Sequence, residues 1–100
     1  MDQLWKRIEE LSGQTLQTMR GNRFEVVSVR PEKAVALRVL VKSTGRRRNI
    51  LRREIESSYQ LGLKGDDLIP LRLRQTGTSD RNPSYVVAIL RAVGAHKLGG

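Results

Sequence analysis

The sequence predicts one small α+β domain, in which an N-terminal helix precedes a three- or four-stranded antiparallel sheet and a helical second half. Three observations support this fold class. The hydrophobic period is helical at the start, alternating from Thr15 and helical again from about Leu51. Turn residues separate these segments. With 100 residues, 38% of them hydrophobic, the chain has the material for one core. We place the domain at 1–95 and expect a flexible tail at 96–100.

The first half of the chain is expected to form one helix and up to four strands. Apolar residues at helical spacing predict a helix over residues 2–11. Alternation then predicts strands at 15–19, 23–29, 34–42 and 46–50. Short turns rich in Gly, Asn, Pro or Ser separate these strands, and connections of this kind favour antiparallel pairing.

The second half is expected to contain three helices, the first of them over residues 51–61. Residues 68–76 leave two alternatives open, because their apolar residues alternate as in a strand while a proline and a glycine can bound a short helix. We favour the helix, which gives the spacing of a helix-turn-helix or winged-helix half. The last helix is the best defined. Asn82 is expected to cap it through its side chain, with Pro83 at the first position and Gly94 at the end.

The strongest global feature of the sequence is its positive charge. Nineteen Lys and Arg against ten Asp and Glu give a net charge of +9, and the pI is near 11.1. Fourteen of the nineteen are arginine, whose guanidinium group suits bidentate contacts with phosphate and guanine. Such an excess favours a polyanionic partner, and nucleic acid is the first candidate. Anionic membrane surfaces and acidic proteins are the rivals.

The densest basic segment runs from residue 38 to residue 53, across the turn between the last two predicted strands and into the helix that follows. We predict phosphate contacts from Arg38, Lys42, Arg46, Arg47, Arg48, Arg52 and Arg53. No acidic residue lies among them, so their mutual repulsion is a cost that a phosphate backbone would reverse. Two alternatives stay open. Arg52 can pair with Glu56 one helical turn on. Strand alternation would also point Arg46 and Arg48 to the same side as Ile50.

The last predicted helix supplies candidates for reading a DNA groove. Its apolar side should face the core, which leaves a second stripe made of Ser84, Ala88, Arg91 and Ala95. A stripe of small residues with one arginine is a shape that a groove can accept. The groove candidates are Arg81, Asn82, Ser84 and Arg91. Arg81 is suited to guanine and Asn82 to adenine. The alternative is a core helix that packs against a neighbour through its small residues.

Catalysis, metal binding and cofactor binding are not expected. The chain has no cysteine and one histidine, which leaves too few ligands for a zinc site. The paired carboxylates Asp66-Asp67 and Glu54-x-Glu56 are assigned to a helix start and to a charged helix face. No apolar run approaches the roughly 18 residues of a membrane span, and the N-terminus lacks signal-peptide features. We therefore expect a cytoplasmic protein without a membrane partner, associated with the nucleoid if it binds DNA.

Three segments together resemble a family of small, uncharacterised prokaryotic modules. The segments are residues 48–56, residues 68–70, and residues 82–90 with their Asn-Pro-Ser-Tyr-Val start. Such modules occur alone or appended to restriction-type nucleases and helicases. The resemblance covers residues 15–93. It implies a β-hairpin region, a winged-helix-like helical half and a DNA-related setting, and it brings no catalytic motif.

Charge, motifs and resemblance lead to one functional prediction. The protein is expected to bind nucleic acid without acting as an enzyme, with double-stranded DNA favoured over RNA and contacts dominated by phosphate. Two alternatives are kept. The first is a protein-interaction subunit that docks an acidic partner through its basic face, and the second is RNA binding.

Overall fold

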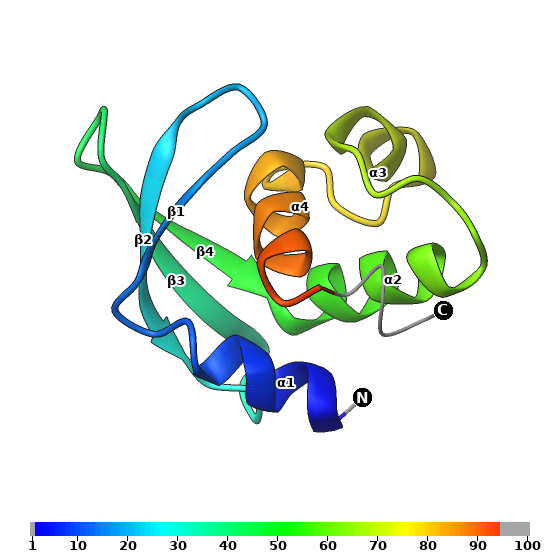
Figure 1. The fold of residues 1–100 in the computed structure, drawn as a ribbon, viewed down its shortest axis with the longest axis horizontal. Coiled ribbons are helices and arrows are strands. Elements are labelled where there is room, and N and C mark those ends of the chain that lie inside the picture. Colours follow the sequence, from blue (N-terminus) through cyan, green and yellow to red (C-terminus); the bar gives the residue numbers. More distant parts are fainter. Residues whose placement is uncertain (1, 95–100) are drawn as a thin grey trace.

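The computed structural model describes residues 2–94 and has two layers, a four-stranded antiparallel sheet and a set of helices packed on one of its faces (Figure 1). This arrangement confirms the predicted α+β class. In chain order the elements are α1 (Asp2–Glu9), β1 (Thr15–Gln17), β2 (Arg23–Val29), β3 (Val35–Val41), β4 (Arg47–Leu51), α2 (Arg52–Leu63), α3 (Pro70–Thr76) and α4 (Pro83–Ala92).

The strands form a meander in the order β1-β2-β3-β4, so that β1 and β4 are the two edges. The cross-strand register places Val26, Val39 and Arg48 side by side on the face toward the helices. The register shifts once between β2 and β3, near Ser28, and once between β3 and β4, near Val35. Irregularities of this kind bend a strand and increase its twist.

The core fills the space between the sheet and the helices. Its fully buried side chains include Phe24, Val26 and Val39 from the sheet, together with Ile55 of α2 and Leu90 of α4. Helices α1 and α2 are joined at the edge of this core, because Trp5 Nε1 donates a 3.0 Å hydrogen bond to Glu56 Oε2. The single tryptophan is therefore part of the helical layer.

Helix α4 is the central helix of the structure, and neighbouring elements cover most of it. Five successive residues, 86–90, are buried, and the helix contacts α2, α3 and β1 (Figure 1). The prediction that the stripe through Ser84, Ala88 and Arg91 faces outward is wrong at Ala88, whose exposed fraction is 7%. The physical reason is that β1 lies against this side of the helix. Ala95, the last member of the stripe, lies outside the described residues.

The predicted element boundaries agree with the structure to within a few residues. The ambiguous segment 68–76 contains the helix α3, as favoured, and Gly77 ends it in the left-handed conformation with φ of 74°. The predicted tail at 96–100 lies outside the described residues. Within residues 2–94, the helices are too short and too polar for any of them to cross a membrane.

Candidate nucleic-acid interface

The face of the sheet that points away from the helices carries exposed arginines. In the register, Arg38 lies opposite Ser28 on one side and Asn49 on the other. Arg47 lies opposite Leu40, one position further along the same face. Both arginines are exposed, whereas Leu37 and Val39, which flank Arg38 in β3, are buried. Strand alternation thus separates an apolar inner face from a basic outer face.

A hollow of about 680 Å³ opens on this outer face at the place where both register shifts occur. Its lining residues come from β2, β3, β4 and the β2–β3 turn, and they are Val27, Ser28, Arg30, Lys33, Ala34, Val35, Arg38 and Arg47. Four of these eight residues are basic and none is acidic. Within residues 2–94, no carboxylate lies within ion-pair distance of any of the four. We call this feature the outer-face hollow.

The basic character extends along the outer face toward the β3–β4 turn. Lys42 lies at the end of β3, and its Nζ pairs with Glu25 Oε1 at 3.1 Å. Because this ion pair is partly exposed, water screens it, and Glu25 offsets the positive charge of Lys42 only in part. Arg46, in the turn itself, is exposed to solvent. The predicted residues Arg38, Lys42 and Arg47 therefore lie on one face, whereas Arg46 lies opposite the buried Val41, whose N–H donates to its carbonyl oxygen at 2.8 Å.

Arg48 points to the opposite side of β4, as its alternation with Ile50 predicts. Its guanidinium carbon lies 5.8 Å from the centre of the Tyr85 ring, and its Nη1 donates to the Arg81 carbonyl oxygen at 3.4 Å. Tyr85 in turn meets Phe24 edge to face, with ring centres 5.1 Å apart. Arg48 is thus a cation over an aromatic surface at the N-terminus of α4, and it does not share the outer face with Arg47.

Arg52 and Arg53 begin α2 and have different surroundings. Arg52 Nε lies 4.0 Å from Glu56 Oε1, which is the predicted pairing one turn on, and its Nη1 reaches the Pro31 carbonyl oxygen at 3.5 Å. Arg53 is exposed and stands at the rim of a second hollow. The seven predicted phosphate contacts therefore do not form one surface.

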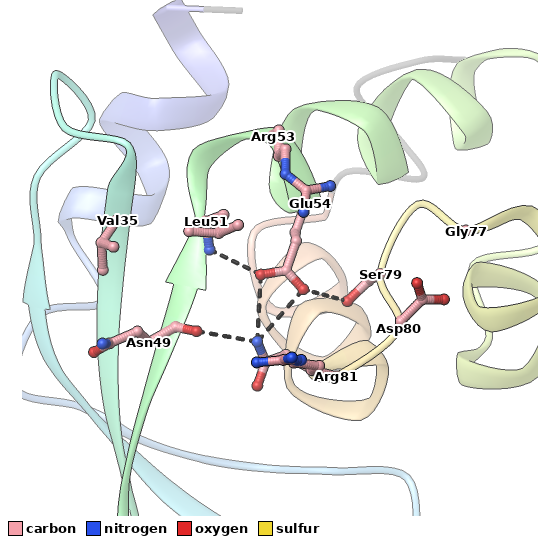
Figure 2. A pocket seen from close by; sticks show the side chains of 10 residues that line it. Val35, Asn49, Leu51, Arg53, Glu54, Gly77, Ser79, Asp80 and Arg81 are labelled. Carbon is pink, nitrogen blue, oxygen red and sulfur yellow. Dashed lines mark hydrogen bonds between the residues drawn. The ribbon is translucent and has the colours of Figure 1, made fainter.

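The second hollow, of about 380 Å³, lies between the end of β4, the start of α2 and the α3–α4 loop (Figure 2). Its floor is Glu54, a carboxylate whose exposed fraction is 5%. Glu54 accepts hydrogen bonds from the Leu51 backbone N–H and from Ser79 Oγ, each at 2.8 Å, and from Asn82 Nδ2 at 3.3 and 3.4 Å (Figure 2). The buried charge is therefore solvated by protein donors, as a buried carboxylate requires.

Two predictions for Asn82 are wrong. The side chain makes no cap hydrogen bond to α4. It also has no free amide for adenine, because Nδ2 donates to Glu54 and, at 3.0 Å, to the Asn49 carbonyl oxygen, and the residue is buried. The physical reason is that Glu54, 28 positions earlier in the chain, is a buried acceptor. Leaving a buried carboxylate without a donor costs more free energy than leaving a helix end without a side-chain cap. Asn82 links three elements and has a structural role.

The other groove candidates are spread along α4. Arg81 is exposed beside the second hollow, and Ser84 is half-buried in the first turn. Arg91 lies near the other end of the helix, where Nε and Nη2 donate to the Leu68 carbonyl oxygen at 3.3 and 3.2 Å. These residues share no face with Arg38 and Arg47. Because α4 is covered by its neighbours, the predicted groove-reading helix is not available in this fold.

The carboxylates have structural partners rather than a common centre. Glu54 and Glu56 point to different networks, since Glu56 accepts from Trp5 on α1. Asp66 accepts from Arg72 Nε at 2.8 Å, and this hydrogen bond and its charge hold the pKa of Asp66 below its ordinary range. Among residues 2–94, His, Cys, Asp and Glu form no group of three that could hold a metal ion.

Four site-forming residues were missed by the sequence analysis, Arg30 and Lys33 in the outer-face hollow and Glu54 and Ser79 in the second hollow. A signal for Glu54 was present, because an acidic residue at the third position of a helix can accept from the backbone N–H of the N-cap residue, here Leu51, as in a capping box. No local signal identifies Ser79, which reaches Glu54 across 25 positions.

Comparison with family models, with curated proteins and with solved structures finds no match to this chain. The resemblance to small prokaryotic modules therefore stays a prediction, and the functional argument rests on the residues themselves.

Proposed function

We propose that this protein binds double-stranded DNA through phosphate contacts on the outer face of its sheet. The observation that carries the proposal is the outer-face hollow, which four basic side chains line and in which, among the described residues, none of the four has a carboxylate within ion-pair distance. Phosphate is the chemical group that matches such a site, because arginine donates in a planar fork and lysine adds a compact charge.

The energetics of the cluster favour an anionic partner over a purely solvated face. Arg30, Lys33, Arg38 and Arg47 repel one another when the hollow is empty. A phosphate backbone in contact with them turns this repulsion into attraction and releases its condensed counterions. The net charge of +9 acts in the same direction, because it raises the rate of encounter with any polyanion.

Binding of this kind is expected to tolerate many sequences. Phosphate contacts position a protein on the duplex but carry no base information. The helix that was the candidate for base readout, α4, is buried and serves to support the sheet. The proposed function is therefore a non-enzymatic, phosphate-dominated DNA-binding activity.

Salt titration of binding to a short synthetic duplex tests the proposal. Arg38→Ala together with Arg47→Ala should weaken binding and lower the log–log salt slope by about 0.9 for each phosphate that the protein no longer neutralises. The matched control is Lys64→Ala together with Arg74→Ala, which removes the same charge from exposed positions in the helical half. Absence of duplex binding by the unaltered protein at low salt would refute the proposal. Equal reductions of affinity in the two double variants would also refute the assigned surface.

A further inference from the structure

Because α4 is buried, another element would have to enter a groove of the duplex. We propose that the β3–β4 hairpin enters the major groove of DNA and contacts the phosphates on both of its walls. This inference rests on the proposed function and deepens it, since it names the element and the groove. Residues 42–46 form the hairpin turn, which projects beyond the body of the domain at the far end from α3 (Figure 1).

The hairpin is basic on both of its faces. Arg47 and Lys42 lie on the outer face of the sheet, opposite Leu40 and next to Glu25 respectively. On the other face, Arg46 lies opposite Val41, to whose N–H its carbonyl oxygen is bonded, and Arg48 lies opposite Val39 and over the Tyr85 ring. A sheet lying flat on a duplex needs cations on one face alone. A ribbon inserted in a groove has a phosphate backbone on either side and needs them on both.

The hairpin turn is also sterically open. Every residue from 42 to 49 is exposed, and nothing lies within 4 Å of the place where a side chain would begin at Gly45. The tip is nonetheless ordered, because Val41 N donates to the Arg46 carbonyl oxygen and Gly45 N to that of Val41, each at 2.8 Å. A two-stranded ribbon fits the major groove, which is about 12 Å wide, and exceeds the minor groove of about 6 Å.

The local charge distribution also favours insertion of the hairpin. Residues 33–53 contain no Asp or Glu, so the hairpin and its flanks carry no group that a phosphate would repel. The carboxylate of Glu25, on the neighbouring strand β2, is paired with Lys42. Conversely, the buried Glu54 would repel a phosphate entering the second hollow, and its donors are already engaged. The hairpin is thus a projecting element that carries no charge opposing its entry into a groove.

Two single variants separate insertion from flat binding. Arg46→Ala and Arg47→Ala remove one cation from each face of the hairpin, and neither side chain makes an ion pair within residues 2–94. Groove insertion predicts that each variant weakens binding to a short duplex and lowers the salt slope by about 1. Arg74→Ala, on exposed α3, is the control of equal charge, and melting temperatures verify that all three variants stay folded.

A second measurement identifies the groove. Duplexes in which cytosine is replaced by its glucosylated 5-hydroxymethyl derivative have their major groove filled, while their phosphate charge is unchanged. We expect the unaltered protein to lose affinity for this duplex and to bind normally in the presence of netropsin, which occupies the minor groove.

The outcomes distinguish the two proposals. Weaker binding in Arg47→Ala alone, with normal affinity for the glucosylated duplex, would overturn hairpin insertion and leave binding by the outer face intact. Competition by netropsin would overturn the choice of the major groove. No duplex binding at any salt concentration would remove the proposed function itself. Weaker binding in both hairpin variants and to the glucosylated duplex, with normal binding in Arg74→Ala, would support the inference.

Discussion

Ser79 Oγ donates a 2.8 Å hydrogen bond to Glu54 Oε1, and both residues are buried where the end of β4, the start of α2 and the α3–α4 loop meet. This bond fixes the α3–α4 loop to the start of α2, and with the bonds from Leu51 and Asn82 it solvates a carboxylate that has no cationic partner within residues 2–94. The network explains why the loop before α4 holds its place although it is short of apolar residues.

Removing the Ser79 hydroxyl should destabilise the domain. Ser79→Ala leaves Glu54 with one donor fewer in a buried setting, and we expect the free energy of unfolding to fall by about 1–3 kcal/mol. Chemical denaturation measures this change. Ser57→Ala, an exposed position on α2, is the control and should be nearly neutral. Equal effects in the two variants would mean that the hydroxyl of Ser79 does not stabilise the carboxylate.

Truncations along α4 test whether the helix is covered on opposite sides. Val87 and Ile89 point in nearly opposite directions around the helix, and both are fully buried. Ile89→Ala should cost about 2–5 kcal/mol of unfolding free energy, and Val87→Ala should also be clearly destabilising. Leu71→Ala on α3, where the exposed fraction is 57%, should change stability by no more than about 0.5 kcal/mol. If Val87→Ala left the free energy of unfolding unchanged, the side of α4 that carries Val87 would not be packed against a neighbouring element.

Arg48 and Arg47, neighbours in β4, should respond differently to replacement by alanine. Arg48→Ala removes the cation over the Tyr85 ring and should lower stability by about 0.5–1 kcal/mol, since the contact is at an exposed site. Arg47→Ala should leave stability unchanged and weaken DNA binding, because its side chain faces solvent on the outer face. Thermal unfolding and duplex titration of the two variants provide the comparison.

The ion pair between Asp66 and Arg72 predicts a pH-dependent contribution to stability. The Arg72 hydrogen bond, with a smaller Coulomb contribution from its charge, lowers the pKa of Asp66 in the folded state. A carboxyl whose folded pKa is depressed stabilises the fold above its unfolded pKa, about 3.9, and loses this contribution as the pH falls through the folded pKa.

The difference in stability between the unaltered protein and Asp66→Asn should therefore be constant near neutral pH and shrink on acidification below about pH 4. Denaturation at a series of pH values provides the test. A difference that stays constant down to low pH would show that the Asp66 charge does not contribute.

The secondary structure could be predicted because its signals are local. Strand β2 occupies the predicted residues 23–29, since alternation over seven residues is a property of the segment itself. Residues 70–76 form a helix and not a strand, because the backbone preferences of Pro70 at its start and Gly77 at its end outweigh a short alternation of apolar residues. Alternation also placed Arg48 on the side of Ile50, although nothing local identifies Tyr85 as the surface it covers.

The candidate site was harder to predict because it depends on contacts between distant segments. The stripe through Ala88 has the pattern of an exposed face, but β1 and the turn that follows it lie against this side of α4. Asn82 has the sequence context of a helix cap, but its side-chain amide donates to the carboxylate of Glu54, which belongs to another helix. The basic residues likewise form a run in sequence, while the pleat of β4 distributes them to two faces.

The bond from Asn82 Nδ2 to the Asn49 carbonyl oxygen has a consequence for how copies of this chain behave in concentrated solution. Asn49 lies in β4, an edge strand, whose outward backbone groups are a template for strand addition by a neighbouring molecule. The side-chain amide occupies one of these acceptors, and the α3–α4 loop stands where an added strand would run. Together with the like charges of the arginines along β4, this cover protects the β4 edge of the sheet from edge-to-edge aggregation.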